Sequence, residues 1–178
     1  SKTLHSLTTL DPHLHRYKTL SEIYAIPTHV IHTAPLISQW ILNNIKNPLL
    51  IGPDSESMKW TSDLASRLNV PYLILEKKRL GDRTVEVSIP DVHLYLDRTP
   101  ILIDDIISTG RTMIETLTHL KKTPLAPPIC IGIHAIFSGN AFEELQPFAA
   151  TKVFRPLLAI ALCILALSFL LRSEERRV

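Results

Sequence analysis

The sequence predicts an α/β fold in which a mostly parallel β-sheet is flanked by helices. Three observations support this prediction. Short apolar runs rich in β-branched residues alternate with segments of helical periodicity along the chain. Strands that are separated by helices form largely parallel sheets with right-handed crossovers. Charged and hydroxyl residues follow several of the apolar runs, as expected where parallel strands end and ligands bind.

The expected elements follow one another from the apolar segment PLLI at residue 48 onward. Apolar residues in short runs are typical of buried strands, and apolar residues three or four positions apart are typical of helices. The expected strands are residues 48–51, 72–75, 85–89, 101–105 and 129–136. The expected helices are residues 57–69, 113–122 and 141–146, and residues 76–83 are expected to form a charged loop.

Length, charge and cysteine content limit the classes of function. The chain has 178 residues, enough for one domain and part of a second. Its net charge of +2 is too small to indicate nucleic-acid binding, and no basic cluster alternates with aromatic residues. Cys130 and Cys163 each lie in an apolar run, which predicts buried free thiols in a reducing compartment. The N-terminal residues do not have the apolar core of a signal peptide, so a cytoplasmic protein is expected.

The C-terminal segment differs from the rest of the chain. Residues 157–171 are almost wholly apolar, a run of about 15 residues where about 20 span a bilayer. A buried helix, a marginal membrane anchor and a tail foreign to the domain all fit this pattern. We favour a frameshifted or chimeric tail, so membrane association is expected only if the apolar run is native.

The segment ILIDDIISTGRT, residues 101–112, is the most informative part of the sequence. An apolar strand ends in the adjacent carboxylates Asp104 and Asp105, and a short loop then leads into a helix. The N–H groups and hydroxyls of such a loop converge on an anion, and the helix dipole favours negative charge there. Carboxylates at the strand end suit sugar hydroxyls or a metal ion, so the segment predicts a site for a phosphorylated sugar. The simpler alternative is an ordinary strand–turn–helix with Asp at the turn.

This segment resembles the 5-phosphoribosyl 1-diphosphate (PRPP) binding motif of type I phosphoribosyltransferases and of ribose-phosphate diphosphokinases. The resemblance implies a phosphoribosyltransferase type I-like fold in which Asp104 and Asp105 hold the ribose hydroxyls. It also implies a cradle for the 5-phosphate made by Ser108, Thr109, Gly110, Arg111 and Thr112. Two residues depart from the families, which often have Asp in place of Ser108 and Gly in place of Arg111.

A second segment follows the first expected strand. Gly52-Pro53-Asp54 is similar to the start of the diphosphokinase loop that meets the diphosphate, which implies a contact between Asp54 and Mg²⁺. The paired glycines of that loop are replaced by Glu56 and Ser57, which is the weakest part of the resemblance. An acidic residue here also fits an ordinary helix N-cap, and one residue can serve both roles.

Lys77 and Arg79 lie in a third segment, Glu76-Lys77-Lys78-Arg79. It resembles the Lys-x-Arg of the diphosphokinases, which implies that Lys77 and Arg79 are catalytic. Cations delivered by a loop can stabilise the charge that develops during transfer of a diphosphoryl group. Taken without the resemblance, three basic residues in a loop are most often a solvated surface.

Two further segments favour the diphosphokinases over the phosphoribosyltransferases. Asp11-Pro12-His13 is similar to the Asp-Leu-His that ends a diphosphokinase strand, which implies a Mg²⁺ contact for His13 with Asp11 as a possible helper. A surface histidine in a polar loop is the alternative. Residues 137–141 (FSGNA) closely match a stretch of the diphosphokinases that is not expected in phosphoribosyltransferases.

The resemblance covers residues 9 to about 153 and implies transfer of the diphosphoryl group of ATP to ribose 5-phosphate, giving PRPP and AMP with Mg²⁺ as cofactor. The family protein is roughly twice as long and has two similar halves, so this chain is expected to lack most of the ATP-binding half. The resemblance also implies a homo-oligomer for the full-length protein. Residues 1–27 would end the N-terminal half, 28–153 would form the C-terminal domain and 154–178 the foreign tail. The alternatives are a PRPP-consuming phosphoribosyltransferase and a non-catalytic partner resembling the PRPP-synthetase-associated proteins.

Overall fold

The computed structural model describes residues 4–14, 16–79, 85–88 and 91–148, with only the backbone for 76–79 and 85–88. The chain divides into two compact units, residues 1–45 and 46–178, and each is described by itself. Cys163 and the apolar run 157–171 lie outside the described residues. Among the helices that are described, none is long and apolar enough to cross a membrane.

The first unit contains a small parallel sheet and one long helix. Strand β1 (Leu7–Leu10) pairs with β2 (Thr28–Ile31), and the short 3-10 helix η1 (Leu20–Glu22) lies between them in the chain. Helix α1 (Ala34–Asn44) begins directly after Thr33, with a proline in its first turn. Its buried side chains Ile37 and Ile41 are four residues apart and so share one face. Neither β2 nor α1 was among the elements expected from the sequence.

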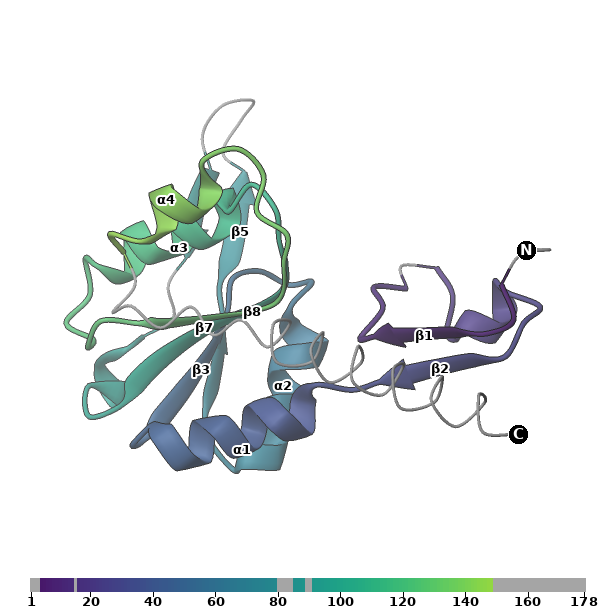
Figure 1. Cartoon of the computed structure of the whole chain (residues 1–178). Helices are drawn as coiled ribbons and strands as arrows, with labels where there is room; N and C mark the ends of the chain where they lie inside the picture. The colour runs from purple at the N-terminus through teal and green to yellow at the C-terminus, as the bar shows by residue number, and fades with distance from the viewer. Residues whose placement is uncertain (1–3, 15, 80–84, 89–90, 149–178) are drawn as a thin grey trace. The chain divides into compact units, whose positions relative to one another are not determined.

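The second unit is built on a four-stranded sheet in the order β4-β3-β7-β8. Every neighbouring pair in this sheet is parallel, which confirms the predicted α/β fold (Figure 1). The strands are β3 (Pro48–Gly52), β4 (Tyr72–Ile74), β7 (Thr99–Ile107) and β8 (Ile129–Ala135). β3 is buried along its whole length, and so are residues 101–103 of β7, as expected for strands covered on both faces.

The helices of this unit are α2 (Met58–Leu68), α3 (Arg111–Leu120), α4 (Ala141–Leu145) and the 3-10 helix η2 (His93–Tyr95). The crossover through α2 leads from β3 to β4, whereas the crossover through α3 leads in the opposite direction, from β7 to β8. Right-handed crossovers that run in opposite directions place their helices on opposite faces of a sheet, and Figure 1 shows α2 and α3 arranged in this way. α4 lies beside α3.

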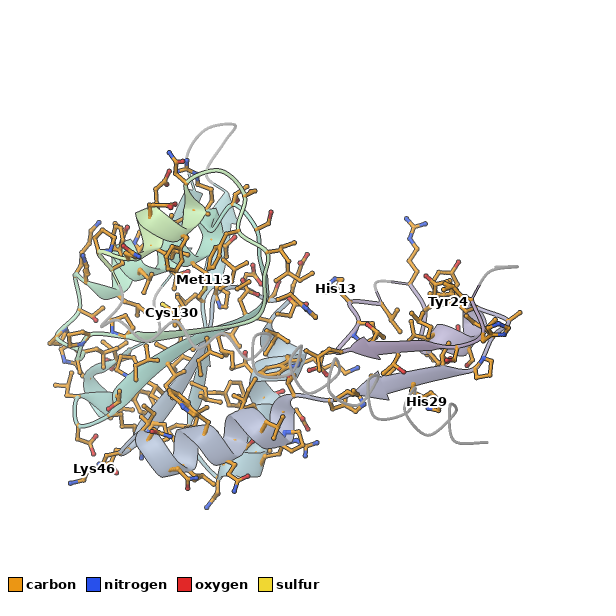
Figure 2. The ribbon with its side chains drawn as sticks, viewed as in Figure 1. His13, Tyr24, His29, Lys46, Met113 and Cys130 are labelled. Carbon is orange, nitrogen blue, oxygen red and sulfur yellow. The ribbon has the colours of Figure 1, made fainter. Side chains whose placement is uncertain are left out.

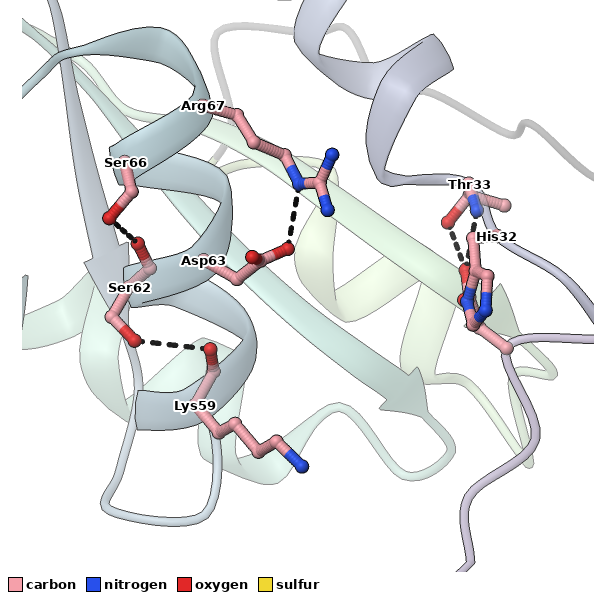
Figure 3. Close-up of polar contacts among 8 residues, drawn as sticks. His32, Thr33, Lys59, Ser62, Asp63, Ser66 and Arg67 are labelled. Atoms are coloured by element: carbon pink, nitrogen blue, oxygen red, sulfur yellow. Dashed lines mark hydrogen bonds and ion pairs between the residues drawn. The ribbon is translucent and has the colours of Figure 1, made fainter. Parts of the chain in front are cut away.

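Polar residues on the exposed side of α2 satisfy one another within the helix. Arg67 Nε donates to Asp63 Oδ2 over 2.8 Å, and Ser66 Oγ donates to the Ser62 carbonyl over 2.8 Å (Figure 3). Asn69 ends the helix in a left-handed conformation, which is a common way for a helix to terminate. These contacts stabilise the polar face of α2, and its apolar face packs on the sheet.

One core cluster of the second unit lies between the sheet and α3, and buried residues of α2 such as Leu64 pack on the other face. The cluster contains strand residues such as Leu49, Ile51 and Leu102 together with Met113 and Leu117 of α3. Cys130 of β8 belongs to the same cluster, and Figure 2 labels it with Met113. The thiol is free, and burial raises its pKa to about 12, so it is a packing residue with little reactivity. The predicted buried free thiol at Cys130 is therefore confirmed.

Three local predictions differ from the structure. Residues 76–79 form strand β5 (Glu76–Arg79), which pairs with antiparallel strand β6 (Val85–Ser88), where a charged loop was expected. β7 continues for two residues beyond Asp105, so the aspartates lie within the strand rather than at its end. α3 begins at Arg111, so Arg111 and Thr112 belong to its first turn and not to the preceding loop.

Candidate functional site

The site lies where the direction of the crossovers reverses. β3 and β7 are parallel neighbours, and the chain leaves them toward opposite edges of the sheet. In open α/β sheets, the carboxyl ends of two such strands form a crevice in which ligands bind. Asp54 follows β3, and the segment from Asp104 to Thr112 spans the end of β7 and the start of α3. The structure therefore brings these sequence-predicted residues to one edge of the sheet.

Asp104 has an unusual electrostatic environment. Burial raises the pKa of its carboxyl from 3.8 to about 7, and the carboxylates of Asp105 and Asp54 contribute to this rise. The backbone N–H of Asp105 donates to Asp104 Oδ1 over 3.0 Å and opposes the shift. A half-buried carboxyl with two acidic neighbours is costly for the fold, and strongly perturbed groups of this kind cluster at functional sites.

This environment predicts that Asp104→Asn stabilises the folded chain above pH 7. Asp104 is ionised in both states there, and keeping it ionised in the folded chain, where its pKa is about 7, costs about 2 kcal/mol for a partly solvated group. As the pH falls below 7, folded Asp104 takes up a proton before the unfolded form does, so the benefit shrinks and vanishes near pH 4. Urea unfolding of both proteins at pH 4, 6 and 8, in buffer containing a chelator, measures this difference.

Asp97→Asn is the matched control because Asp97 is exposed in the same unit. It removes the same charge and should leave the free energy of unfolding within about 0.5 kcal/mol at each pH. The amide introduced by Asp104→Asn would keep an oxygen that accepts the Asp105 N–H. Equal stability of Asp104→Asn and the parent chain at pH 8 would contradict the electrostatic account of this cluster.

The loop between β7 and α3 has the geometry of an anion site. Gly110 precedes α3 with a φ of 67°, a left-handed conformation that favours glycine. A Cβ at this position would lie 3.2 Å from Leu145 Cδ1, so the space beside the loop is also limited. The N–H groups of the first turn of α3 point toward this loop, and the helix dipole adds positive potential. Ser108 and Thr109 add hydroxyl groups to the same loop.

Residues that follow β8 support this loop from the other side. Ser138 donates its N–H to the Ser108 carbonyl over 3.0 Å, and its Oγ lies 3.4 Å from Ser108 Oγ. Arg111 Nη1 lies 3.2 Å from Glu144 Oε2 of α4. The sequence did not predict roles for Ser138 or Glu144. The FSGNA stretch that contains Ser138 was the available signal, whereas no local pattern marks Glu144 as a partner of Arg111.

Asp54 organises the turn between β3 and α2. Its Oδ1 accepts the N–H of Glu56 over 3.1 Å and that of Ser57 over 3.3 Å. The Ser57 hydroxyl donates to the Asp54 carbonyl over 2.6 Å. The N-cap of α2 is Ser57, without a side-chain capping bond, so Asp54 has a role in the turn and is not the helix N-cap that the sequence allowed. A ligand role is compatible with it, because both of the bonds to the side chain use the same carboxylate oxygen.

Asp11 and His13 lie in the first unit, at the end of β1. The Asp11 carboxylate accepts the backbone N–H of Thr33 over 2.8 Å and also the Thr33 hydroxyl, and His32 Nδ1 lies 3.0 Å from it (Figure 3). These bonds hold the end of β1 to the start of α1. His13 is exposed, and Figure 2 shows it beside this strand. The structure thus gives Asp11 a local structural role in its own unit.

The donor set can be compared with the needs of Mg²⁺. Within the described part of the chain, no group of three or more His, Cys, Asp or Glu side chains could hold a metal ion by itself. Mg²⁺ keeps several water molecules and is often held by one or two carboxylates together with substrate phosphates. Asp54 and Asp104, which are close enough for the charge of one to shift the pKa of the other, supply hard oxygen ligands of that kind. They fit a Mg²⁺ ion that arrives with a phosphorylated substrate.

Lys77 and Arg79 lie on β5, which begins two residues after β4 ends. β4 is the parallel neighbour of β3, so β5 starts at the same carboxyl edge as Asp54. The paired strands β5 and β6 form a ribbon that is separate from the main sheet. The backbone therefore places the start of the basic segment at the edge that carries the acidic cluster and the anion loop.

Comparisons with known proteins show what this chain is similar to. The model of the phosphoribosyl transferase domain family matches residues 19–160. A ribose-phosphate pyrophosphokinase of Sulfurisphaera tokodaii is 32% identical over 114 residues, which cover 62% of this chain and 38% of the relative. One of Thermoplasma volcanium is 28% identical over 142 residues, which cover 79% and 48%. The chain thus spans less than half the length of these curated relatives.

A solved structure shares the fold. The phosphoribosylpyrophosphate synthetase of Mycobacterium smegmatis superimposes with a TM-score of 0.69 at 21% sequence identity. The superposition covers 85% of this chain and 48% of that one. At this level of identity, the likeness supports the arrangement of strands and helices described above.

Proposed function

The chain belongs to the phosphoribosyl transferase domain family, and from this membership we propose that it supplies the ribose-phosphate half of a ribose-phosphate diphosphokinase. The whole enzyme would transfer the diphosphoryl group of ATP to ribose 5-phosphate, giving PRPP and AMP. The observation that carries this proposal is the shared carboxyl edge of β3 and β7, where an acidic cluster lies next to an anion loop. The curated relatives named ribose-phosphate pyrophosphokinase support the choice of reaction.

Each group at this edge has a task in the proposed reaction. The loop from Ser108 to Gly110 and the first turn of α3, with Arg111 and Thr112, bind the 5-phosphate through their N–H groups and hydroxyls, assisted by the α3 dipole. Asp104 and Asp105 accept hydrogen bonds from the ribose hydroxyls and orient the sugar for transfer. Positioning of this kind can supply a large part of the rate enhancement in phosphoryl-type transfers.

A Mg²⁺ ion bound together with the ATP phosphates would supply neutralisation of charge on the transferring group. Asp54 is the proposed contact from this unit, with one oxygen engaged in the turn before α2. For His13 a Mg²⁺ contact is proposed from the resemblance of Asp11-Pro12-His13 alone, and Asp11 would hold the end of β1 through Thr33. Lys77 and Arg79 would stabilise charge that develops during transfer.

One observation favours a second candidate, a non-catalytic regulatory partner of such an enzyme. Glu56 stands in the turn after β3 where the resemblance leads one to expect glycine, and its side chain is exposed. A carboxylate near a diphosphate is repulsive unless it points away or meets a metal ion. Turnover measurements on the longer protein separate the two candidates, since only the enzyme forms AMP from ATP and ribose 5-phosphate.

The proposal predicts ligand binding by the chain itself. Because the loop and the acidic cluster lie within one unit, the chain should bind ribose 5-phosphate with a dissociation constant of about 0.1–1 mM and ATP at least about tenfold more weakly. Isothermal titration with each ligand, in the presence of Mg²⁺, measures both affinities. Ribose without phosphate should bind too weakly to detect, because the loop provides most of the contacts.

Gly110→Ala tests whether the loop is responsible for this binding. It alters the left-handed residue that shapes the loop, and the acidic cluster stays intact. Affinity for ribose 5-phosphate should fall at least about tenfold, with an unchanged circular dichroism spectrum. Tighter binding of ATP than of ribose 5-phosphate by the parent chain would overturn the assignment of this half.

A further inference from the structure

Arg111 and Glu144 form an ion pair next to the anion loop. Arg111 Nη1 lies 3.2 Å from Glu144 Oε2, and the side chains are 73% and 40% exposed. Arg111 is the first residue of α3, directly after Gly110, whereas Glu144 comes from α4. The pair therefore joins the proposed phosphate cradle to a helix that follows a different strand.

The position of Glu144 is fixed by packing rather than by the ion pair alone. Leu145, its neighbour in α4, is buried and belongs to the core of this unit. Its Cδ1 would lie 3.2 Å from a Cβ on Gly110, so α4 stands against the loop. The Glu144 N–H donates to the Asn140 carbonyl over 2.9 Å, which anchors this residue in the helix. A carboxylate is thereby held beside the place where a phosphate is expected.

We propose that Glu144 is a positioning residue that holds the Arg111 guanidinium on α4 and thereby limits the affinity of the loop for phosphate. This inference rests on the proposed function, because it takes residues 108–112 as the phosphate cradle. A phosphate in the loop must share Arg111 with Glu144. Arginine pairs with carboxylates and phosphates through the same planar donors, so the two anions compete directly.

A lower affinity of the loop for phosphate would help product release in this reaction. Ribose 5-phosphate and PRPP carry the same 5-phosphate, so tight binding of this group would hold back the product as much as the substrate. The same phosphate is present in the transition state, and an interaction that is equal in the substrate and in the transition state does not accelerate the chemical step. Glu144 thus adjusts how long phosphorylated sugars stay bound, and Arg111 is the group through which it acts.

The test uses Glu144→Gln in the whole chain, titrated with ribose 5-phosphate and separately with inorganic phosphate. The amide keeps the size of the side chain and removes its charge. Affinity for both ligands should rise about three- to fivefold at low salt, the range expected for an exposed charge pair. At about 1 M salt, where the screening length is about 3 Å, the gain should fall below about twofold.

Three variants separate competition from a structural effect. Glu143→Gln changes the same formal charge on the neighbouring exposed residue and should alter the affinity less than about twofold. Glu144→Asp keeps the carboxylate and should restore the affinity of the parent. Arg111→Gln should weaken binding, and adding Glu144→Gln to it should then change the affinity by less than about twofold, because the shared partner is gone.

The outcomes distinguish the two proposals. If the parent chain binds ribose 5-phosphate and Glu144→Gln binds it no more tightly, the role of Glu144 is wrong and the proposed function stands. The same conclusion follows if Glu144→Gln has its full effect in the Arg111→Gln background. If neither the parent nor Glu144→Gln binds ribose 5-phosphate or phosphate, the proposed function fails and this inference fails with it.

Discussion

Lys77→Ala and Arg79→Ala should each lower turnover at least about 100-fold in a protein that joins this chain to an ATP-binding half, with a change of less than about threefold in KM for ribose 5-phosphate. The reason is differential binding. Charge develops on the oxygens of the diphosphoryl group only during transfer, so the loss of a cation removes transition-state stabilisation. Ground-state contacts to the sugar phosphate come from the anion loop and remain. Initial rates of AMP formation at varied ribose 5-phosphate give both parameters.

Lys46→Ala is the matched control for these variants. Lys46 is exposed and precedes β3, so it lies at the amino end of the strand, opposite the candidate site. Its removal changes the charge equally and should leave turnover within about twofold of the parent. Asp104→Ala forms a useful contrast, because it should raise KM as well as lower turnover. Turnover of Lys77→Ala within a few-fold of the parent would show that the basic segment is only a charged surface.

Gly52→Ala should destabilise the chain by about 3 kcal/mol or more. Gly52 ends β3, and a Cβ there would lie 2.3 Å from Ser57 Oγ, 2.7 Å from Ile74 Cδ1 and 2.9 Å from Thr61 Oγ1. Ser57 directly precedes α2, Ile74 lies in β4 and Thr61 lies within α2. No single movement therefore relieves all three contacts. Urea unfolding followed by circular dichroism measures the loss, which should also displace the Asp54 turn two residues later.

Gly139→Ala tests whether this effect comes from crowding. Gly139 has a φ of 58°, and nothing lies within 4 Å of its Cβ position. Alanine there should cost only the strain of a left-handed conformation, about 1 kcal/mol. The two decreases in the free energy of unfolding therefore compare the cost of steric crowding at Gly52 with the cost of backbone strain at Gly139. A loss from Gly52→Ala no greater than that from Gly139→Ala would contradict the close packing at the end of β3.

The fold and the central part of the site were predictable because their signals are local. The strand–loop–helix of residues 101–112 carries its apolar run, carboxylates and hydroxyls in one continuous segment. The strands at 48–51 and 129–136 and the helix at 57–69 agree with the structure to within one residue at each end. α1 was missed although Ile37 and Ile41 have helical spacing, because its exposed leucines Leu36 and Leu42 blur the apolar face.

Other features depend on contacts between distant segments, and no local sequence pattern predicts them. The charged segment 76–79 forms a strand because it pairs with residues 85–88, and pairing can override a polar composition. The support of Ser108 by Ser138 and the pairing of Arg111 with Glu144 each join segments on either side of β8. Asp54 adds to the raised pKa of Asp104, after burial and Asp105, and the pairing of β3 with β7 brings it near.

The strand order also bears on how the chain folds. Ile101 pairs with Ile129, whereas Pro48 pairs with Thr99, so joining β3 to β7 closes a loop roughly twice as long as joining β7 to β8. Short loops close at lower entropic cost, and contacts between distant segments slow folding. We expect β7, α3 and β8 to associate first and to form the anion loop with its supporting serine. Asp54 then joins Asp104 only when β3 docks, so the electrostatically strained part of the site is assembled after its phosphate-binding part.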